Sequence, residues 1–314
     1  MDKVLLMFPG QGSQHRGMGI EFLRKNPQYK DYFDQCSDSL GDDILDIIAE
    51  EGQVLDKTEY CQPAIYTLSC ALFDFLCRQA GLQKIAGAAI GHSLGDYSAL
   101  FACGAYSFSE GLDLVIERSS LMAEENKASE GMMAAVLGAG QEEVSGLIKR
   151  AGLDVYIANY NHHSQTVLSG KKKQIMETIK VFKENGIRKI IPLKVGVASH
   201  CPLLADTSEK LKEYMQKIDI SKFNIPFYSS TLNGFIGQGE VKNNLGQQLI
   251  KPIKWKHSIN RLLESGYNTY MEIGPKEVLG GLVKNIAKKN GSEVKIFNTL
   301  DLDELIKRLK GGTH

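Results

Sequence analysis

The sequence lacks the usual marks of a metal-binding, nucleic-acid-binding or membrane protein. Its six cysteines include no CxxC pair, so the ligand spacing of zinc and thioredoxin-type sites is missing. Lysine plus arginine number 37 and aspartate plus glutamate also number 37, so no net charge favours nucleic acid or an anionic membrane. The N-terminal apolar run, Val4–Phe8, is too short for a signal peptide or a membrane span. We therefore expect a cytoplasmic protein whose thiols are reduced.

The chain also lacks the glycine spacing of nucleotide-binding loops. A GxGxxG fingerprint that begins at Gly10 needs glycine at position 15, where His15 stands. A Walker A motif that ends at Gly170-Lys171 needs an earlier glycine at position 165, where Gln165 stands. The sequence therefore predicts no nucleotide cofactor.

Hydrophobic periodicity predicts an α/β protein. Over most of the chain strands alternate with helices, which indicates a mostly parallel sheet with helices on both faces. The strands expected there are Val4–Phe8, Ala86–Ile90, Pro226–Ser229 and Asn268–Glu272. The helices expected there are Ala64–Ala80, Tyr97–Cys103, Ser109–Glu125 with Ser109 as N-cap, Leu203–Lys217, Trp255–Ser265 and Glu277–Lys288.

The middle of the chain has a different order of elements. It contains four expected strands, Met132–Leu137, Val155–Ala158, Thr166–Ser169 and Ile187–Pro192, and two expected helices, Glu142–Arg150 and Lys172–Glu184. The resulting β-α-β-β-α-β order is the ferredoxin-like pattern. We therefore expect residues 128–196 to form a small α+β subdomain, inserted into a larger one made of residues 1–127 and 197–314.

The segment Gly91-His92-Ser93-Leu94-Gly95 matches the motif GxSxG and lies between an expected strand and an expected helix. Such a turn holds its serine outward, and its glycines avoid clashes in the tight bend. The backbone N–H of Leu94, at the start of the helix, can face a developing oxyanion. We therefore predict that Ser93 is a nucleophile rather than an ordinary turn serine.

A general base for Ser93 must be sought among the downstream histidines, which are His162, His163, His200, His257 and His314. The glycine-rich tail around His314 and the polar helical stretch around His257 favour surface positions. His200 stands between a segment of small residues that follows a strand and the start of a helix, a junction that suits a base with a pKa near neutrality. From these features alone, a catalytic role and a purely structural role for His200 are about equally favoured.

Two other segments are ambiguous by themselves. Phe8–Gln14 is a glycine-rich turn in which the N–H of Gln11 is placed to face an oxyanion, although a simple tight turn explains it as well. Arg118 follows the GxSxG segment on the next helix, where its guanidinium is able to bind a substrate carboxylate through two hydrogen bonds. Spacing alone favours a surface cation at this position.

Taken together, these segments resemble the malonyl-CoA:acyl carrier protein transacylase family, which includes the fatty-acid enzyme and the acyltransferases of polyketide synthesis. The matching stretches run nearly from end to end, and their order and spacing are highly specific. They are Phe8–Gln14, Gln62–Ala64, Gly91–Gly95, Arg118 with Leu121-Met122, Ser199-His200 and Glu272–Pro275.

The resemblance implies a hydrolase-like α/β subdomain with an inserted ferredoxin-like one. It also implies a Ser–His dyad, two backbone N–H groups as oxyanion hole, a carboxylate-binding arginine with a glutamine beside it, and a backbone carbonyl that orients the histidine. In this sequence those residues are Ser93 and His200, Gln11 and Leu94, Arg118 and Gln62, and Gln248.

The implied activity is that of an acyl-carrier-protein S-malonyltransferase. A malonyl group passes from malonyl-CoA to Ser93, and from there to the phosphopantetheine thiol of an acyl carrier protein, by a ping-pong mechanism. The expected partners are the carrier protein and the coenzyme A thioester, with no nucleic acid and no membrane. We expect a monomer that needs no metal and no redox cofactor.

Three alternatives to this activity stay open at this point. The first is a discrete polyketide-synthase acyltransferase for a substituted malonyl group, the second is an editing hydrolase of the same fold, and the third is an inactive scaffold that docks carrier proteins. Arg118 argues against the hydrolase, because a neutral acyl chain gives a buried arginine no partner. The sequence departs from the family at Asp96, where glutamate is common, and at Asn161–Gln165, where Asn-Ser-Pro-Gly-Gln is common.

Overall fold

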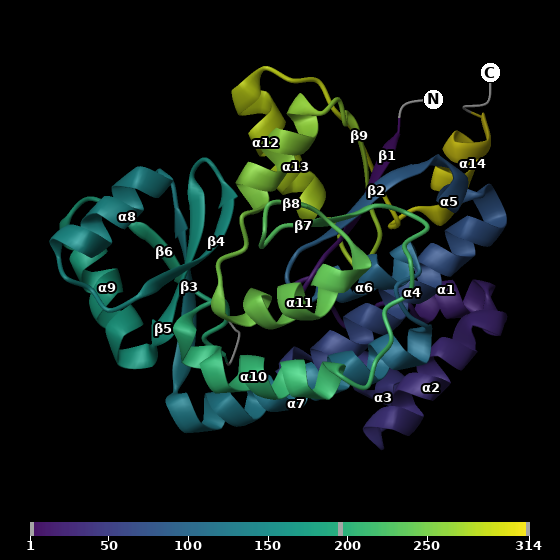
Figure 1. Ribbon diagram of the computed structural model, residues 1–314, viewed down its shortest axis with the longest axis horizontal. Helices are drawn as coiled ribbons and strands as arrows, with labels where there is room; N and C mark the ends of the chain where they lie inside the picture. Colours follow the sequence, from purple (N-terminus) through teal and green to yellow (C-terminus); the bar gives the residue numbers. More distant parts are fainter. Residues whose placement is uncertain (1–2, 194–196, 312–314) are drawn as a thin grey trace.

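Two β-sheets organise the chain (Figure 1), whose computed structural model describes residues 3–193 and 197–311. The larger sheet has the strand order β10-β9-β1-β2-β7-β8. Every neighbouring pair in it is parallel except β7 and β8. Its strands are β1 (Val4–Phe8), β2 (Ala86–Gly91), β7 (Phe227–Ser229), β8 (Gly234–Ile236), β9 (Thr269–Glu272) and β10 (Lys295–Asn298). The predicted mostly parallel sheet is confirmed.

Helices cover both faces of this sheet because the central strand β1 is apolar throughout. Side chains alternate between faces along a strand, so Leu6 and Phe8 join one hydrophobic core while Leu5 and Met7 join another. The first core is built with α1 (Ile20–Lys25), α2 (Lys30–Leu40), α3 (Ile44–Ala49), α4 (Thr58–Ala80), α5 (Leu82–Ile85), α6 (Gly95–Cys103), α7 (Phe108–Ser129), α10 (Ala205–Met215), α11 (Val241–Ile250) and α14 (Leu302–Gly311). The second is built with α12 (Trp255–Glu264) and α13 (Leu279–Asn290).

The smaller sheet lies to the left of the larger one in Figure 1 and is antiparallel throughout, with the order β4-β5-β3-β6. Its elements are β3 (Gly131–Leu137), α8 (Gln141–Arg150), β4 (Tyr156–His162), β5 (Gln165–Lys171), α9 (Lys172–Glu184) and β6 (Lys189–Pro192). All six elements expected in this region form. The two helices pack on one face of the sheet, and the opposite face is turned to the site described below.

Several helix ends differ from the sequence prediction, each for a local reason. Ser107, not Ser109, caps α7, because its side chain accepts from the N–H of Glu110 in a capping box. Helix α13 begins at Leu279 rather than at residue 277, because the buried carboxylate of Glu272 accepts from three successive N–H groups at its start. Helix α4 begins six residues early and contains Pro63.

Helices α1, α2, α3, α5, α11 and α14 and the short strands β8 and β10 were not predicted. His314 and the expected subdomain boundary at residue 196 lie outside the described residues. No helix in the described ranges is both long enough and apolar enough to cross a lipid bilayer.

Candidate active site

The Gly91–Gly95 turn joins β2 to α6 and carries Ser93 in a left-handed conformation, with φ of 54°. Neighbouring backbone leaves no room for side chains at either end of the turn. A Cβ atom on Gly91 would lie 2.0 Å from the backbone nitrogen of Asp96, and one on Gly95 would lie 1.9 Å from the carbonyl oxygen of Phe8. The spacing of the motif is therefore a steric requirement of this turn.

His200 and Ser93 meet although 107 residues separate them in the chain. His200 Nε2 lies 2.9 Å from Ser93 Oγ, and His200 Nδ1 lies 2.6 Å from the backbone carbonyl oxygen of Gln248 on α11. His200 is itself in a left-handed conformation, with φ of 61°, just before the 3₁₀ turn Pro202–Leu204. Since a carbonyl oxygen only accepts, Nδ1 carries the proton and Nε2 presents its lone pair to Ser93.

His200 is a neutral base in this setting. Burial lowers its pKa to about 3, and the positive charge of Arg118 acts in the same direction, while the hydrogen bond to Gln248 partly opposes both. The imidazole is therefore unprotonated at neutral pH and able to accept a proton from Ser93.

Arg118, on α7, is buried, with 1% of its surface exposed, so the surface position favoured by spacing alone is wrong. Its Nη1 donates to Gln62 Oε1, and its Nη2 donates to Ser93 Oγ at 3.2 Å. The guanidinium carbon also lies 5.3 Å from the centre of the Tyr97 ring. None of the ion pairs among the described residues includes Arg118. A buried cation beside the serine hydroxyl, with only neutral partners, is prepared for an anionic ligand.

The turn after β1 packs against the Ser93 turn. The N–H of His92 donates to the carbonyl of Phe8 at 3.0 Å. Among the described residues, the backbone N–H groups of Gln11 and Leu94 donate to no acceptor. The side chain of Gln11 accepts from Gln62 Nε2 at 3.3 Å. Both predicted oxyanion donors are thus unengaged, on turns in contact with each other.

The side chains of Gln248 and Asp96 also belong to the site, although only the backbone carbonyl of Gln248 was predicted to take part. The Gln248 side chain is buried and donates through Nε2 to the carbonyl oxygen of Ser93 at 3.0 Å and to Asp96 Oδ2 at 2.6 Å. Its Oε1 accepts from Arg118 Nη2 at 3.4 Å. The available signal was the position of an acid directly after the GxSxG motif.

Asn161 connects the two sheets beside the site. Its Oδ1 lies 3.0 Å from Nε2 of His92, and its Nδ2 donates to Gln165 at 3.1 Å. His162 follows in β4 and is half-buried at the edge of the cleft. His257 is also half-buried, with its ring edge-on to Tyr160, so its expected surface position is only partly correct.

The cleft that contains these groups has a volume of about 720 Å³ and lies between the two sheets. Ser93, His200 and Arg118 line it, and Met133, Ala135 and Val167 line it from the face of the smaller sheet that its two helices leave uncovered. Its lining also includes Gln11 and Gln62. Within the described residues, no cluster of histidine, cysteine, aspartate or glutamate has the makings of a metal site.

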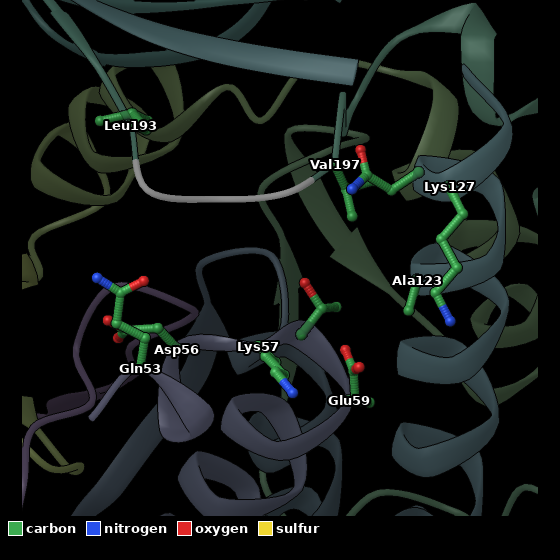
Figure 2. Close-up of a pocket in the computed structure, with 10 residues that line it drawn as sticks. Gln53, Asp56, Lys57, Glu59, Ala123, Lys127, Leu193 and Val197 are labelled. Carbon is green, nitrogen blue, oxygen red and sulfur yellow. The ribbon is translucent and has the colours of Figure 1, made fainter. Parts of the chain in front are cut away.

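A second hollow of about 530 Å³ adjoins the cleft and shares Asp56, Leu193 and Val197 with it. Figure 2 shows side chains of both charges around it, including Lys57, Glu59 and Lys127. The described residues that line it include no serine, cysteine or histidine, so we assign the chemistry to the cleft that holds Ser93.

The known proteins to which this chain is similar are acyltransferases. The acyl transferase domain family matches residues 5–305. The malonyl CoA-acyl carrier protein transacylase of Bacillus subtilis is 37% identical over 294 residues, which are 92% of this chain and 92% of that protein. The polyketide biosynthesis malonyl CoA-acyl carrier protein transacylase PksC of the same organism is 34% identical over 91% of this chain and 97% of its own length.

Among solved structures, a complex of a type II PKS acyl-carrier protein with its malonyl-transacylase contains a chain of the same fold. The TM-score is 0.91 at 29% sequence identity, and the match covers 98% of this chain and 99% of that chain. The hydrolase-like fold with a smaller antiparallel sheet is therefore confirmed.

Proposed function

The chain belongs to the malonyl-CoA:acyl carrier protein transacylase family, and from this we propose that it moves a malonyl group from malonyl-CoA to an acyl carrier protein through an ester on Ser93. The observation that carries the proposal is the meeting of three groups. Ser93 Oγ lies 2.9 Å from the basic nitrogen of His200 and 3.2 Å from the buried guanidinium of Arg118.

The first half-reaction begins at the Ser93 hydroxyl. His200 Nε2 accepts its proton as Oγ attacks the thioester carbonyl carbon of malonyl-CoA. The N–H groups of Gln11 and Leu94 hold the oxyanion of the tetrahedral intermediate. The carbon–sulfur bond then breaks, and the coenzyme A thiol leaves with the proton from His200.

Arg118 selects the acyl group. The free carboxylate of the malonyl group pairs with its guanidinium, whose hydrogen-bond partners in the structure are all neutral. Pairing also offsets the positive charge that lowers the pKa of His200, so the base becomes stronger when the correct acyl group is present. Gln62, which accepts from the same guanidinium, holds it in place.

The second half-reaction repeats these steps with the phosphopantetheine thiol of the carrier protein as nucleophile. The solved complex of a malonyl-transacylase with an acyl-carrier protein supports this choice of partner. The reaction draws its nucleophile, base and oxyanion donors from one chain, so we propose a monomer that uses no metal and no redox cofactor. The six free cysteines agree with the cytoplasmic location that we expect.

A polyketide role is the second candidate, and the similarity to PksC favours it. The cleft chemistry is the same in both cases, so the carrier protein and the acyl group distinguish them. Transfer rates to fatty-acid and polyketide carrier proteins, with malonyl-CoA and with substituted malonyl-CoA as donors, decide between the two roles.

The test of the proposal is a mass measurement on the intact protein after incubation with labelled malonyl-CoA. We expect one malonyl adduct, located on Ser93, and none in the Ser93→Ala variant. Addition of a holo acyl carrier protein should move the label to its thiol. An adduct that water releases faster than the carrier accepts it indicates an editing hydrolase, and the absence of an adduct indicates a scaffold.

A further inference from the structure

Asp96 is a buried acid that the proposed reaction does not use. It lies in the first turn of α6, and its side chain has no exposure to solvent. Its Oδ2 accepts from Gln248 Nε2 at 2.6 Å. Its Oδ1 has no hydrogen bond of ordinary geometry among the described residues, and the backbone N–H of Gly91 acts only weakly on the carboxyl. A buried carboxyl with an unpaired oxygen is costly, and such groups gather at functional sites.

The side-chain amide of Gln248 connects Asp96 with Arg118. Its nitrogen donates to the carbonyl oxygen of Ser93, and its oxygen accepts from Arg118. A carbonyl oxygen only accepts and a guanidinium only donates, so these contacts fix which end of the amide faces each partner. The Asp96 oxygen takes the second N–H of the same nitrogen. One end of the guanidinium is therefore held in place by Asp96 through a single side chain.

The charge state of Asp96 affects the same guanidinium. Asp96 is the carboxyl group whose charge acts on Arg118. Burial raises the pKa of Asp96 to about 8, although the hydrogen bond from Gln248 and the charge of Arg118 both act to lower it. Near pH 7 Asp96 is therefore mostly a neutral acid, and the positive charge of Arg118 is not compensated within the site.

We propose that Asp96 is a positioning residue that sets the preference for acyl groups bearing a carboxylate. It holds the Gln248 amide against Arg118, and in its neutral form it leaves the guanidinium charge to the malonyl carboxylate. When Asp96 ionises, its negative charge compensates Arg118 and opposes a second carboxylate in the cleft. This inference rests on the proposed function, because it assumes that a malonyl group enters the site.

Other groups near Asp96 do not change charge in the same pH range. The buried titratable residues on the elements packed around it include Cys61, Cys70, His92, Tyr97, Tyr106, Arg118 and His200. Burial raises the pKa of these thiols and phenols and lowers that of both imidazoles, so all of these groups stay neutral near pH 8. The guanidinium stays charged. A change near pH 8 is therefore assigned to Asp96.

The experiment compares the unsubstituted protein with two variants at Asp96. Asp96→Asn keeps an oxygen that accepts from Gln248 but does not titrate, whereas Asp96→Ala removes the acceptor. Asp113→Asn, an exposed position on α7, is the matched control. For each protein, kcat/KM for acylation of Ser93 by malonyl-CoA, and by acetyl-CoA, is measured from about pH 6.5 to about pH 9.5 by rapid quenching and intact mass.

We expect the malonyl kcat/KM of the unsubstituted protein, divided by that of Asp96→Asn, to fall above about pH 8 by up to about tenfold per pH unit. Asp113→Asn should follow the unsubstituted protein. Asp96→Ala should lose most of the preference for malonyl over acetyl at every pH, because the Gln248 nitrogen then keeps only its bond to the Ser93 carbonyl and the amide is held less firmly against Arg118.

The inference would be overturned if the malonyl kcat/KM of the unsubstituted protein, divided by that of Asp96→Asn, stayed constant over the whole pH range. An unchanged malonyl preference in Asp96→Ala would also overturn it. In either case, acylation of Ser93 by malonyl-CoA would leave the proposed function standing. If Asp96→Asn does not fold, the ratio of malonyl to acetyl kcat/KM is compared across the same pH range in the unsubstituted protein alone. A fall in this ratio above about pH 8 supports the inference, and a constant ratio overturns it. Absence of any malonyl adduct in the unsubstituted protein counts against the proposed function instead.

Discussion

His200 Nδ1 lies 2.6 Å from the backbone carbonyl oxygen of Gln248, which follows it by 48 residues in the chain. The contact leaves His200 Nε2 as the base beside Ser93 without the help of a carboxylate. The side chain of Gln248 also contacts Arg118. One residue of α11 therefore positions both the base and the group proposed to bind the substrate carboxylate.

Removal of the base should slow acylation without abolishing binding. We expect His200→Ala to lower kcat/KM for acylation of Ser93 by about 10²–10⁴-fold, the usual contribution of a general base. His257→Ala, which removes a half-buried histidine of α12, is the control and should stay within a few-fold of the unsubstituted protein. Rapid-quench mass measurement follows the adduct, and equal losses in the two variants would contradict the assignment.

Replacement of Arg118 should change the choice of acyl group. A hydrogen bond to a charged group contributes about 1.5–3 kcal/mol, so Arg118→Ala should lower kcat/KM for malonyl-CoA by about 10–150-fold. The rate with acetyl-CoA should change much less, because an acetyl group has no carboxylate. Arg118→Lys should recover little, since an ammonium lacks the planar fork. Arg78→Ala, which removes an exposed arginine, is the control. An unchanged malonyl-to-acetyl ratio in Arg118→Ala would refute the role.

Acid should affect the reaction only at low pH. The pKa of His200 is lowered to about 3, so kcat/KM for malonyl-CoA should stay nearly constant from about pH 7.5 to about pH 5. A histidine with an ordinary pKa near 6.5 would lose about 30-fold over this range. A pH–rate profile of Ser93 acylation makes the comparison, and an inflection near pH 6.5 would contradict the burial of the base.

The same shift in pKa has a consequence for stability. In the unfolded chain His200 binds a proton at higher pH than in the folded protein, so the free energy of unfolding should decrease as pH falls from about 6.5 towards 3. His200→Gln removes this contribution and should lose less stability over the same range. Urea unfolding of both proteins at several pH values measures the difference, and parallel pH dependences would contradict the expectation.

The Ser93 turn should not tolerate side chains in place of its glycines. In Gly95→Ala the new Cβ meets the backbone oxygen of Phe8 at 1.9 Å, and we expect a loss of at least about 3 kcal/mol in the free energy of unfolding. Gly281→Ala, inside α13 with open space around the position, should instead stabilise by about 0.5–1 kcal/mol. Chemical denaturation tests both, and similar effects would contradict the steric account.

Some parts of the fold follow from local sequence, and others do not. Strand β1 is apolar throughout and forms over the residues predicted for it, because a central parallel strand is buried on both faces. Helices α2 and α3 were missed, since each has only two buried residues and depends on packing against others. Ser107 and Ser109 are the same residue type and equally suited to cap a helix. Only the capping box that Ser107 forms with Glu110 decides which of them is the N-cap of α7.

The sequence by itself determined the chemistry of this protein. The glycine spacing around Ser93 forces the strained turn, and the order of motifs along the chain identifies the family. Tertiary structure alone decided the partners of each group. It brought His200 to Ser93 across 107 residues and buried Arg118 without an ion pair among the described residues. It also placed the Asp96 carboxyl where it accepts a hydrogen bond from the Gln248 side chain. These contacts join residues far apart in the chain, and a buried charge takes its pKa from such neighbours rather than from its position in the sequence.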